Sequence, residues 1–185
     1  VDHPGVPNSR LVQEKSPMAL EYKGKSVAEQ NSVDIAWTIL MGRKYSKLRD
    51  AICPTKEELL RFRQLVVNIV MATDIVDKDL KQLRDNRWDK AFSESFQEPE
   101  RDRMNRKATI VIEHLIQASD VSHTMQHWHI YSKWNEKLFE ELYVAFKEGR
   151  SDTDPSEFWY KGELAFFDGY ILPLAKKLRD CGVFG

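Results

Sequence analysis

Three of the chain's five histidines fall within seven positions, in the stretch QASDVSHTMQHWHIYSKW at 117–134. They are His123, His127 and His129, and Asp120 stands about one helical turn before the first of them. Residues three or four positions apart share a face of a helix, so Asp120, His123 and His127 would point the same way on a continuous helix. Carboxylate oxygens and imidazole nitrogens both bind zinc. The stretch therefore admits a metal site, although two histidines four apart are a weak signal by themselves.

Asp120 has two interpretations. It follows an apolar run from Ile110 to Ala118, where a carboxylate is unfavourable unless a cation or N–H donors meet it. It could cap the junction between two helices, because Asp favours caps, or it could be a metal ligand. His127 and His129 are interpreted as polar positions on the following helix.

Further candidate residues lie far from this stretch. His3 precedes the Pro4-Gly5 turn, and Glu29 lies on a predicted helix. Asp74 follows a strongly apolar run and so needs a partner. Glu163 stands among Leu164, Ala165, Phe166 and Phe167. It is either a charged position on an aromatic helix or a polar group in the wall of an aromatic pocket, where Phe166 could stack on a flat ligand.

Composition excludes several classes of partner. The formal net charge is −1 and no basic stripe carries interleaved aromatic residues, so we expect no nucleic acid partner. The eight glycines form neither GxGxxG nor GxxxxGK[ST]. No apolar run approaches the ~20 residues that span a bilayer, and we expect no membrane contact by this segment. Cys53 and Cys181 are expected to be free thiols.

The elements that must position these residues are predicted to be helices. Apolar residues recur at helical spacing over 26–43, 59–75 and 125–148, and the second of these is predicted to be largely buried. Thr55 with Glu58 forms a capping box, and Asp154 with Pro155 starts another helix, which Pro173 should kink or deprive of one bond. Residues 1–16 and 93–107 are predicted to be loops. Without any segment of period two, we expect a compact, all-α, multi-helix single domain spanning 1–185.

Five stretches, taken in order, resemble the catalytic domain of class I 3′,5′-cyclic nucleotide phosphodiesterases. DHPG at 2–5 looks like that family's Asp-His-Pro-Gly, and SVAEQN at 26–31 is similar to its Ser-Val-Leu-Glu-Asn. MATDI at 71–75 looks like Ala-Thr-Asp-Met, and ASDVSH at 118–123 is similar to Ala-Asp-Leu-Ser-Asn. FFDGYILPL at 166–174 resembles Phe-Ile-Asp-Tyr-Ile-Val-x-Pro-Leu. Each motif is short, but their order and spacing hold over nearly the whole chain.

This resemblance implies an all-α fold of the cyclic nucleotide phosphodiesterase and His-Asp phosphohydrolase type. It implies hydrolysis of cAMP, cGMP or both to nucleoside 5′-monophosphates by a hydroxide held between two divalent metals, zinc and magnesium or manganese. Asp120 matches the aspartate that ligates the zinc-like metal. His3, Glu29 and Thr73 match positions around the metals that hold bound water. The implied substrate-binding residues are Glu163, Phe166, His123, Leu138 and Ile75, with Leu138 and Phe166 as an apolar clamp on the purine.

Three departures from the family pattern matter. The family's metal-binding His-Asp pair and its His-Asn-x-x-His would stand upstream of Val1, so we expect most metal ligands there and expect this segment alone to be inactive. Glu163 replaces the glutamine that contacts the purine, and a carboxylate cannot donate a hydrogen bond unless it is protonated. His123 replaces an asparagine of the same wall.

Two rival functions stay open at this point. One is a non-catalytic cyclic-nucleotide-binding or regulatory module that has lost its metals, and the other is a different metal-dependent phosphohydrolase of the His-Asp type. The resemblance implies a cytoplasmic domain in a parent protein that is possibly anchored to a membrane, or fused to sensory, cyclase or membrane domains.

Overall fold

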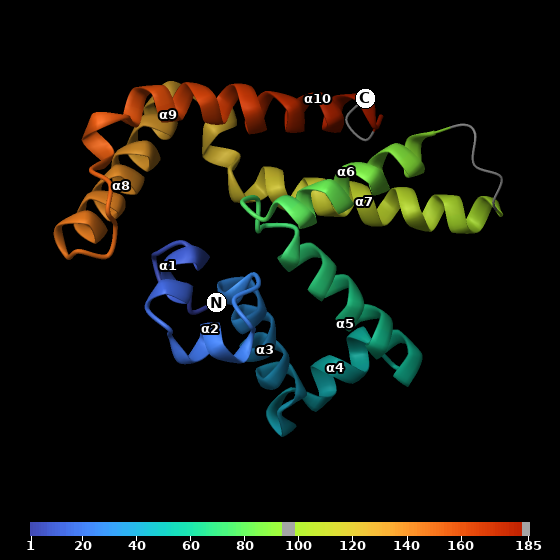
Figure 1. Cartoon of the computed structure of the whole chain (residues 1–185). Coiled ribbons are helices and arrows are strands. Elements are labelled where there is room, and N and C mark those ends of the chain that lie inside the picture. The colour runs from blue at the N-terminus through green and yellow to red at the C-terminus, as the bar shows by residue number, and fades with distance from the viewer. Residues whose placement is uncertain (94–98, 183–185) are drawn as a thin grey trace.

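The computed structural model describes residues 1–93 and 99–182, and all regular structure within those residues is helical (Figure 1). The prediction of an all-α fold is confirmed. The α-helices in chain order are α1 (Asn8–Gln13), α2 (Pro17–Glu21), α3 (Val27–Met41), α4 (Ser46–Ile52), α5 (Lys56–Met71), α6 (Lys78–Phe92), α7 (Glu100–Asp120), α8 (Trp128–Lys147), α9 (Trp159–Phe166) and α10 (Leu172–Asp180).

Local sequence signals fix several helix ends as predicted. The Thr55 hydroxyl accepts from the Glu58 N–H at 3.2 Å, while the Thr55 N–H donates to the Glu58 carboxylate at 3.0 Å, which completes the capping box of α5. Helix α8 ends at Lys147, and Gly149 follows its C-cap with a φ of +71°, a left-handed conformation that favours glycine. Because of this turn, the Arg150 N–H reaches the Ala145 carbonyl at 2.8 Å.

Two sequence predictions about α5 and α7 are wrong. Helix α5 packs between α3 and α7 but has no buried residue, because its apolar stripe is only partly covered by these two neighbours. The predicted loop at 93–107 is helical from Glu100 onward. Pro99 stands at the N-cap of α7, and the acidic Glu100 and Asp102 in its first turn favour the helix N-terminus. Residues 94–98 of that predicted loop lie outside the described residues.

The histidine-rich stretch is not one continuous helix. Helix α7 ends at Asp120, a 3₁₀ turn covers Ser122–Met125, and His127 is the N-cap of α8 with extended backbone angles of −56° and 146°. His123 and His127 therefore do not share a helix face.

Pro173 interrupts the last helical region in the predicted way. Proline has no N–H, so Pro173 cannot donate to the carbonyl four residues earlier. The segment just before it, Phe167–Ile171, is a π-helical turn between α9 and α10. Such turns are frequent at functional sites.

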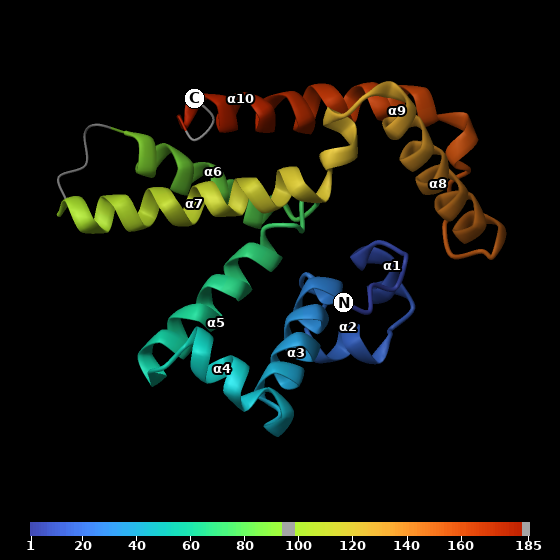
Figure 2. The same ribbon diagram turned by 180° about the vertical axis from the view of Figure 1, so that it is seen from behind.

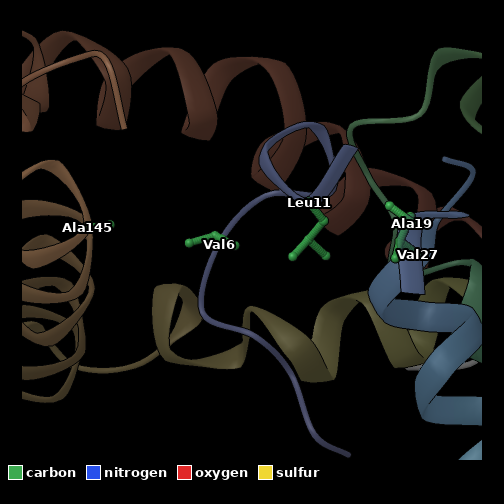
Figure 3. Close-up of a cluster of buried hydrophobic side chains, with 5 residues drawn as sticks. All are labelled: Val6, Leu11, Ala19, Val27 and Ala145. Atoms are coloured by element: carbon green, nitrogen blue, oxygen red, sulfur yellow. The ribbon is translucent and has the colours of Figure 1, made fainter. Parts of the chain in front are cut away.

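Two buried apolar clusters hold the helices together. The first joins α1, α2 and α3 to α8, and Figure 3 shows Val6 lying between Ala145 and Leu11. The second joins the end of α7 to the π-turn and to α10, which run side by side in both views (Figures 1 and 2). Members of the first cluster are Val6, Leu11, Ala19, Val27 and Ala145, and those of the second are Val121, Ile171, Leu174 and Leu178.

The solvent-accessible surface area is larger than that of a typical folded monomer of this mass. It is 12858 Å², against about 9,200 Å² for such a monomer. Trp128, Tyr160 and Leu60 are among the large side chains that stay exposed. In the part of the chain that the structure describes, no helix is long and apolar enough to cross a membrane. Both cysteines are free, as predicted.

Candidate functional site

One cavity, of about 610 Å³, brings together five of the site residues that the family resemblance implies, and Asp74 lines it as well. Its walls come from the N-terminal segment, the start of α3, the turn after α5 and the middle of α8. These segments are far apart in the chain, so only folding places them around one space. The five residues are His3, Glu29, Thr73, Ile75 and Leu138.

The polar groups of this cavity are held in defined orientations. The Gly5 N–H donates to His3 Nδ1 at 3.2 Å, so the proton of the neutral imidazole lies on Nε2. The Thr73 hydroxyl donates to the Val70 carbonyl at 2.7 Å, which leaves its oxygen lone pairs as acceptors. Each side chain thus keeps one group with which it can hold water.

Asn8 positions Glu29, and sequence reasoning missed it. Its Nδ2 donates to Glu29 Oε2 at 2.9 Å, and its Oδ1 accepts from the Ala28 N–H at 3.0 Å. The same Nδ2 lies 3.4 Å from Asp74 Oδ2. The sequence signal that could have identified Asn8 is its place in Pro7-Asn8-Ser9, because asparagine side chains in such turns often form hydrogen bonds with the backbone.

The Asp74 carboxylate accepts hydrogen bonds from several donors, as its position after an apolar run led us to expect. It is buried, and its Oδ2 accepts from the Ser26 hydroxyl at 2.7 Å. Its Oδ1 accepts from the N–H groups of Val76 and Asp77 at 3.3 and 3.2 Å. This carboxylate is therefore occupied in joining α3 to the turn before α6.

We expect Asp74→Ala to lower the free energy of unfolding by about 3 kcal/mol, because it leaves several buried donors unpaired. The matched control is Asp79→Ala, because the exposed Asp79 carboxylate pairs with Lys25 at 3.5 Å, a surface ion pair worth less than about 1 kcal/mol. Chemical denaturation followed by tryptophan fluorescence measures both. Equal stabilities for the two variants would contradict the structural role of Asp74.

Asp120 stands apart from this network. It is the last residue of α7, and the structure gives its carboxylate no hydrogen bond or ion pair among the described residues, which does not support the capping interpretation. Although the residue as a whole is exposed, protein atoms crowd the carboxylate, and this burial raises its pKa. The imidazoles of His3 and His123 favour the charged carboxylate and so act on this pKa in the opposite direction.

A second cavity, of about 500 Å³, has Glu163 in an aromatic wall. The Tyr131 hydroxyl and the Asn135 amide, the latter at 2.7 Å, both donate to Oε2 of Glu163. Trp159 Nε1 in turn donates to Asn135 Oδ1 at 3.0 Å. Burial, and then the bond to Glu163, raise the pKa of the Tyr131 hydroxyl, so it stays protonated as a donor. The arrangement fixes one oxygen of Glu163 and leaves the other available.

His123 is not among the residues that line this cavity, but it packs on Tyr131, which does line it. Its ring stacks on Tyr131 with the centroids 6.4 Å apart and the planes 7° from parallel. Sequence reasoning found Glu163 and His123 but missed Tyr131, Asn135 and Trp159. The spacing of Tyr131 and Asn135, one helical turn apart, was a usable signal.

A third cavity, of about 370 Å³, is lined by Phe166 and again by Ile75. The Phe166 ring stacks on Tyr170 at 5.4 Å between centroids. Leu138 does not line this cavity, so the two residues of the implied purine clamp face different spaces here. Ile75 and Val76 line both spaces.

His114, also in this third cavity, makes stability depend on pH. The side chain is buried, its Nδ1 lies 2.7 Å from the Ile110 carbonyl, and burial lowers the pKa from 6.5 to about 4. The unfolded chain then binds a proton more readily than the folded one. The stability contributed by neutral His114 is complete above pH 6.5 and is lost as pH falls towards 4.

We therefore expect His114→Leu to flatten the dependence of the unfolding free energy on pH between 4 and 6.5. The change in slope should approach about 1.4 kcal/mol per pH unit, the value for one proton. His129→Leu, at an exposed position on α8, should keep the wild-type slope. Urea denaturation at a series of pH values measures this, and identical slopes for all three proteins would refute it.

Comparisons with known proteins agree on one family. Residues 1–182 match the model of the family described as 3′5′-cyclic nucleotide phosphodiesterase. The dual specificity calcium/calmodulin-dependent 3′,5′-cyclic nucleotide phosphodiesterase 1B of Bos taurus is 27% identical over 190 residues, covering 97% of this chain and 32% of that protein. The probable 3′,5′-cyclic-AMP phosphodiesterase pde-4 of Caenorhabditis elegans is 28% identical over 193 residues, covering 97% and 27%. The chain thus spans less than a third of the length of these relatives.

Solved structures establish the same fold. The phosphodiesterase domain of the Salpingoeca rosetta rhodopsin phosphodiesterase superposes with a TM-score of 0.75 and 19% identity, covering 98% of this chain and 56% of that one. A second crystal structure, of the phosphodiesterase domain of the RhoPDE fusion protein from this choanoflagellate, gives a TM-score of 0.73 and covers 98% and 58%. At this level of identity the likeness concerns the fold alone.

Proposed function

Because the chain belongs to the 3′,5′-cyclic nucleotide phosphodiesterase family, we propose that it forms part of the catalytic domain of an enzyme that hydrolyses cAMP or cGMP to the nucleoside 5′-monophosphate. The observation that carries this proposal is the cavity of about 610 Å³, which gathers His3, Glu29, Thr73, Ile75 and Leu138. These residues come from four segments that are widely separated in the sequence. Their convergence supports a common site.

The described residues fit a shared metal site in part. Among the described residues Asp120 offers a carboxylate with no other partner, and His3 and His123 interact with it electrostatically. Carboxylates and imidazoles are donor types that zinc and manganese accept. Within residues 1–93 and 99–182, no three His, Cys, Asp or Glu side chains are grouped to hold a metal ion. Asp120 is therefore proposed as one ligand among several. When bound, divalent metals of this kind supply an activated water and a Lewis acid.

The chain's other residues would orient water and substrate. Glu29, held by Asn8, and Thr73, whose lone pairs are open, would accept hydrogen bonds from water beside the metals. His3 would donate from Nε2. Leu138 and Ile75, which line the same cavity, would supply apolar surface against the purine. Phe166 and Glu163 line other cavities, so their proposed contacts with the purine, and that of His123 with its polar edge, rest on the family resemblance.

We also propose that this domain lies in the cytoplasm of a longer signalling protein. A solved neighbour is described as part of a rhodopsin fusion protein, which supports fusion to a sensory segment as one arrangement.

The test is hydrolysis of cAMP and of cGMP by the full-length protein with added magnesium or manganese, and again after chelation. We expect turnover that depends on metal. If the metal-loaded protein hydrolyses neither nucleotide, the enzyme proposal fails and the binding-module alternative takes its place.

A further inference from the structure

A cluster of ion pairs connects α1 to the C-terminal end of α8, and none of its residues belongs to the proposed site. Arg150, just after α8, donates two parallel hydrogen bonds to the Glu14 carboxylate, from Nε and from Nη2, both at 3.1 Å. Arg10, on α1, donates from Nε to the same carboxylate at 2.9 Å. A second Arg10 nitrogen donates to the Gly149 carbonyl at 2.6 Å. Arg10, Glu14 and Arg150 together are called the latch below.

The charges of the latch are balanced. A guanidinium that contacts both oxygens of a carboxylate forms a stronger and more directional pair than a single contact does. The bond from Arg150, and then that from Arg10, lower the pKa of the Glu14 carboxyl, which is therefore ionised at neutral pH. Glu148 also attracts Arg150, so two cations face two anions. The side chains of Arg10, Glu14 and Arg150 are 22%, 30% and 35% exposed, so protein atoms cover most of each.

Few other contacts fix α8 relative to the N-terminal segment, residues 1–13. The elements against which α8 packs extensively are the turns that flank it. Its apolar connection is Ala145, which shares a buried cluster with Val6 and Leu11 (Figure 3). Beside this contact the boundary is hollow, because the cavity of about 610 Å³ and another of about 440 Å³ both reach Gly5, Val6 and Glu141. Among the described residues, the latch supplies the hydrogen bonds that cross this boundary.

The position of α8 sets the span of the proposed nucleotide site. His3 lies on the N-terminal segment, and Asn8 on α1 holds Glu29, whereas Leu138 lies on α8 across the same cavity. A nucleotide with its phosphate at the first wall and its purine at Leu138 must reach both walls at once. If the walls separate, binding has to bring them together again, and the free energy of that closure weakens the affinity.

We propose that the latch holds this cavity at the width that fits a cyclic nucleotide, so that Arg10, Glu14 and Arg150 are positioning residues for the substrate. This inference rests on the proposed function of the cavity. Without the latch, only a fraction of the molecules has its walls at the competent separation, and KM rises as that fraction falls. The bound substrate itself holds the walls together, so kcat stays near the wild-type value.

The experiment compares Arg150→Met, Glu14→Gln and the double variant with the wild type, as full-length protein with added magnesium. We expect Arg150→Met to raise KM for the hydrolysed nucleotide about three- to fivefold and to keep kcat within about twofold, the range for a partly exposed ion pair. The double variant should not exceed Glu14→Gln, because both changes break the same pair. At about 1 M KCl the ratio of the variant and wild-type KM values should approach one, since salt screens the latch.

Matched controls make the same chemical changes at exposed positions outside the cavity. They are Arg179→Met on α10 and Glu21→Gln on α2, and both should keep the wild-type KM. Hydrogen–deuterium exchange gives a second readout that does not depend on catalysis. The backbone amides of α1 should exchange faster in Arg150→Met than in Arg179→Met, because the latch no longer holds α1 against α8.

Several outcomes would overturn the proposal. One is an unchanged KM in Arg150→Met, including a loss of kcat alone, which reports only a smaller folded fraction. Others are additive effects in the double variant and equal exchange of α1 in Arg150→Met and Arg179→Met. If the wild type hydrolyses neither nucleotide, the enzyme proposal fails separately. The exchange comparison then decides whether the latch holds α1 to α8.

Discussion

Replacing Asp120 with alanine should reduce hydrolysis of both cyclic nucleotides by about a thousandfold or more, or roughly 4 kcal/mol of transition-state stabilisation. The reason is that Asp120, at the end of α7, is a carboxylate without any other partner in the described structure and interacts electrostatically with His3 and His123. Its loss removes a proposed metal ligand without breaking a hydrogen bond that supports the fold. The measurement is kcat/KM for cAMP and cGMP with the full-length protein.

Two controls separate loss of metal from loss of fold. Asp102→Ala changes an exposed aspartate in the first turn of the same helix and should keep nearly full activity. Metal content after dialysis against zinc should fall in Asp120→Ala and stay at the wild-type level in Asp102→Ala. Full activity in a folded Asp120→Ala protein would remove Asp120 from the metal site, while leaving the family assignment intact.

Replacing Glu163 with glutamine should lower the preference for cGMP over cAMP by about tenfold or more, the value of one charge-assisted hydrogen bond. Tyr131 and Asn135 occupy Oε2 of Glu163, so the group that remains for a purine is a carboxylate oxygen that only accepts. Guanine presents adjacent N–H donors to such an oxygen. Adenine presents a single amino group beside an accepting ring nitrogen, which repels it. Glutamine restores a donor and relaxes this difference.

The measurement is the ratio of kcat/KM for the two nucleotides in the full-length protein. Glu157→Gln makes the same chemical change at an exposed position in the turn before α9 and should leave the ratio unchanged. An unchanged ratio in Glu163→Gln would mean that Glu163 does not contact the base.

Much of the local structure could be predicted from the sequence. The capping box at Thr55 and the glycine after α8 depend on residues within a few positions of each other, and both predictions hold. The prediction of a loop at 100–107 from its many charged residues is wrong. The acidic residues there favour the start of α7. Apolar spacing alone overestimated the burial of α5, because spacing identifies a stripe but not what covers it.

The candidate site, like the fold, could be predicted from the sequence only in part. The sequence by itself determined the helical class, the family motifs and the residue types that chemistry would need, since these are carried by neighbours in the chain. Only the tertiary structure decided that Asn8 holds Glu29, that Asp74 is occupied by Ser26 and two backbone N–H groups, and that Tyr131 and Asn135 orient Glu163. It also divides the histidine-rich stretch between the end of α7, a 3₁₀ turn and the start of α8, and within the described residues Asp120 has no partner. These outcomes depend on which helix faces meet across long separations in the chain, and spacing within one segment carries no information about that.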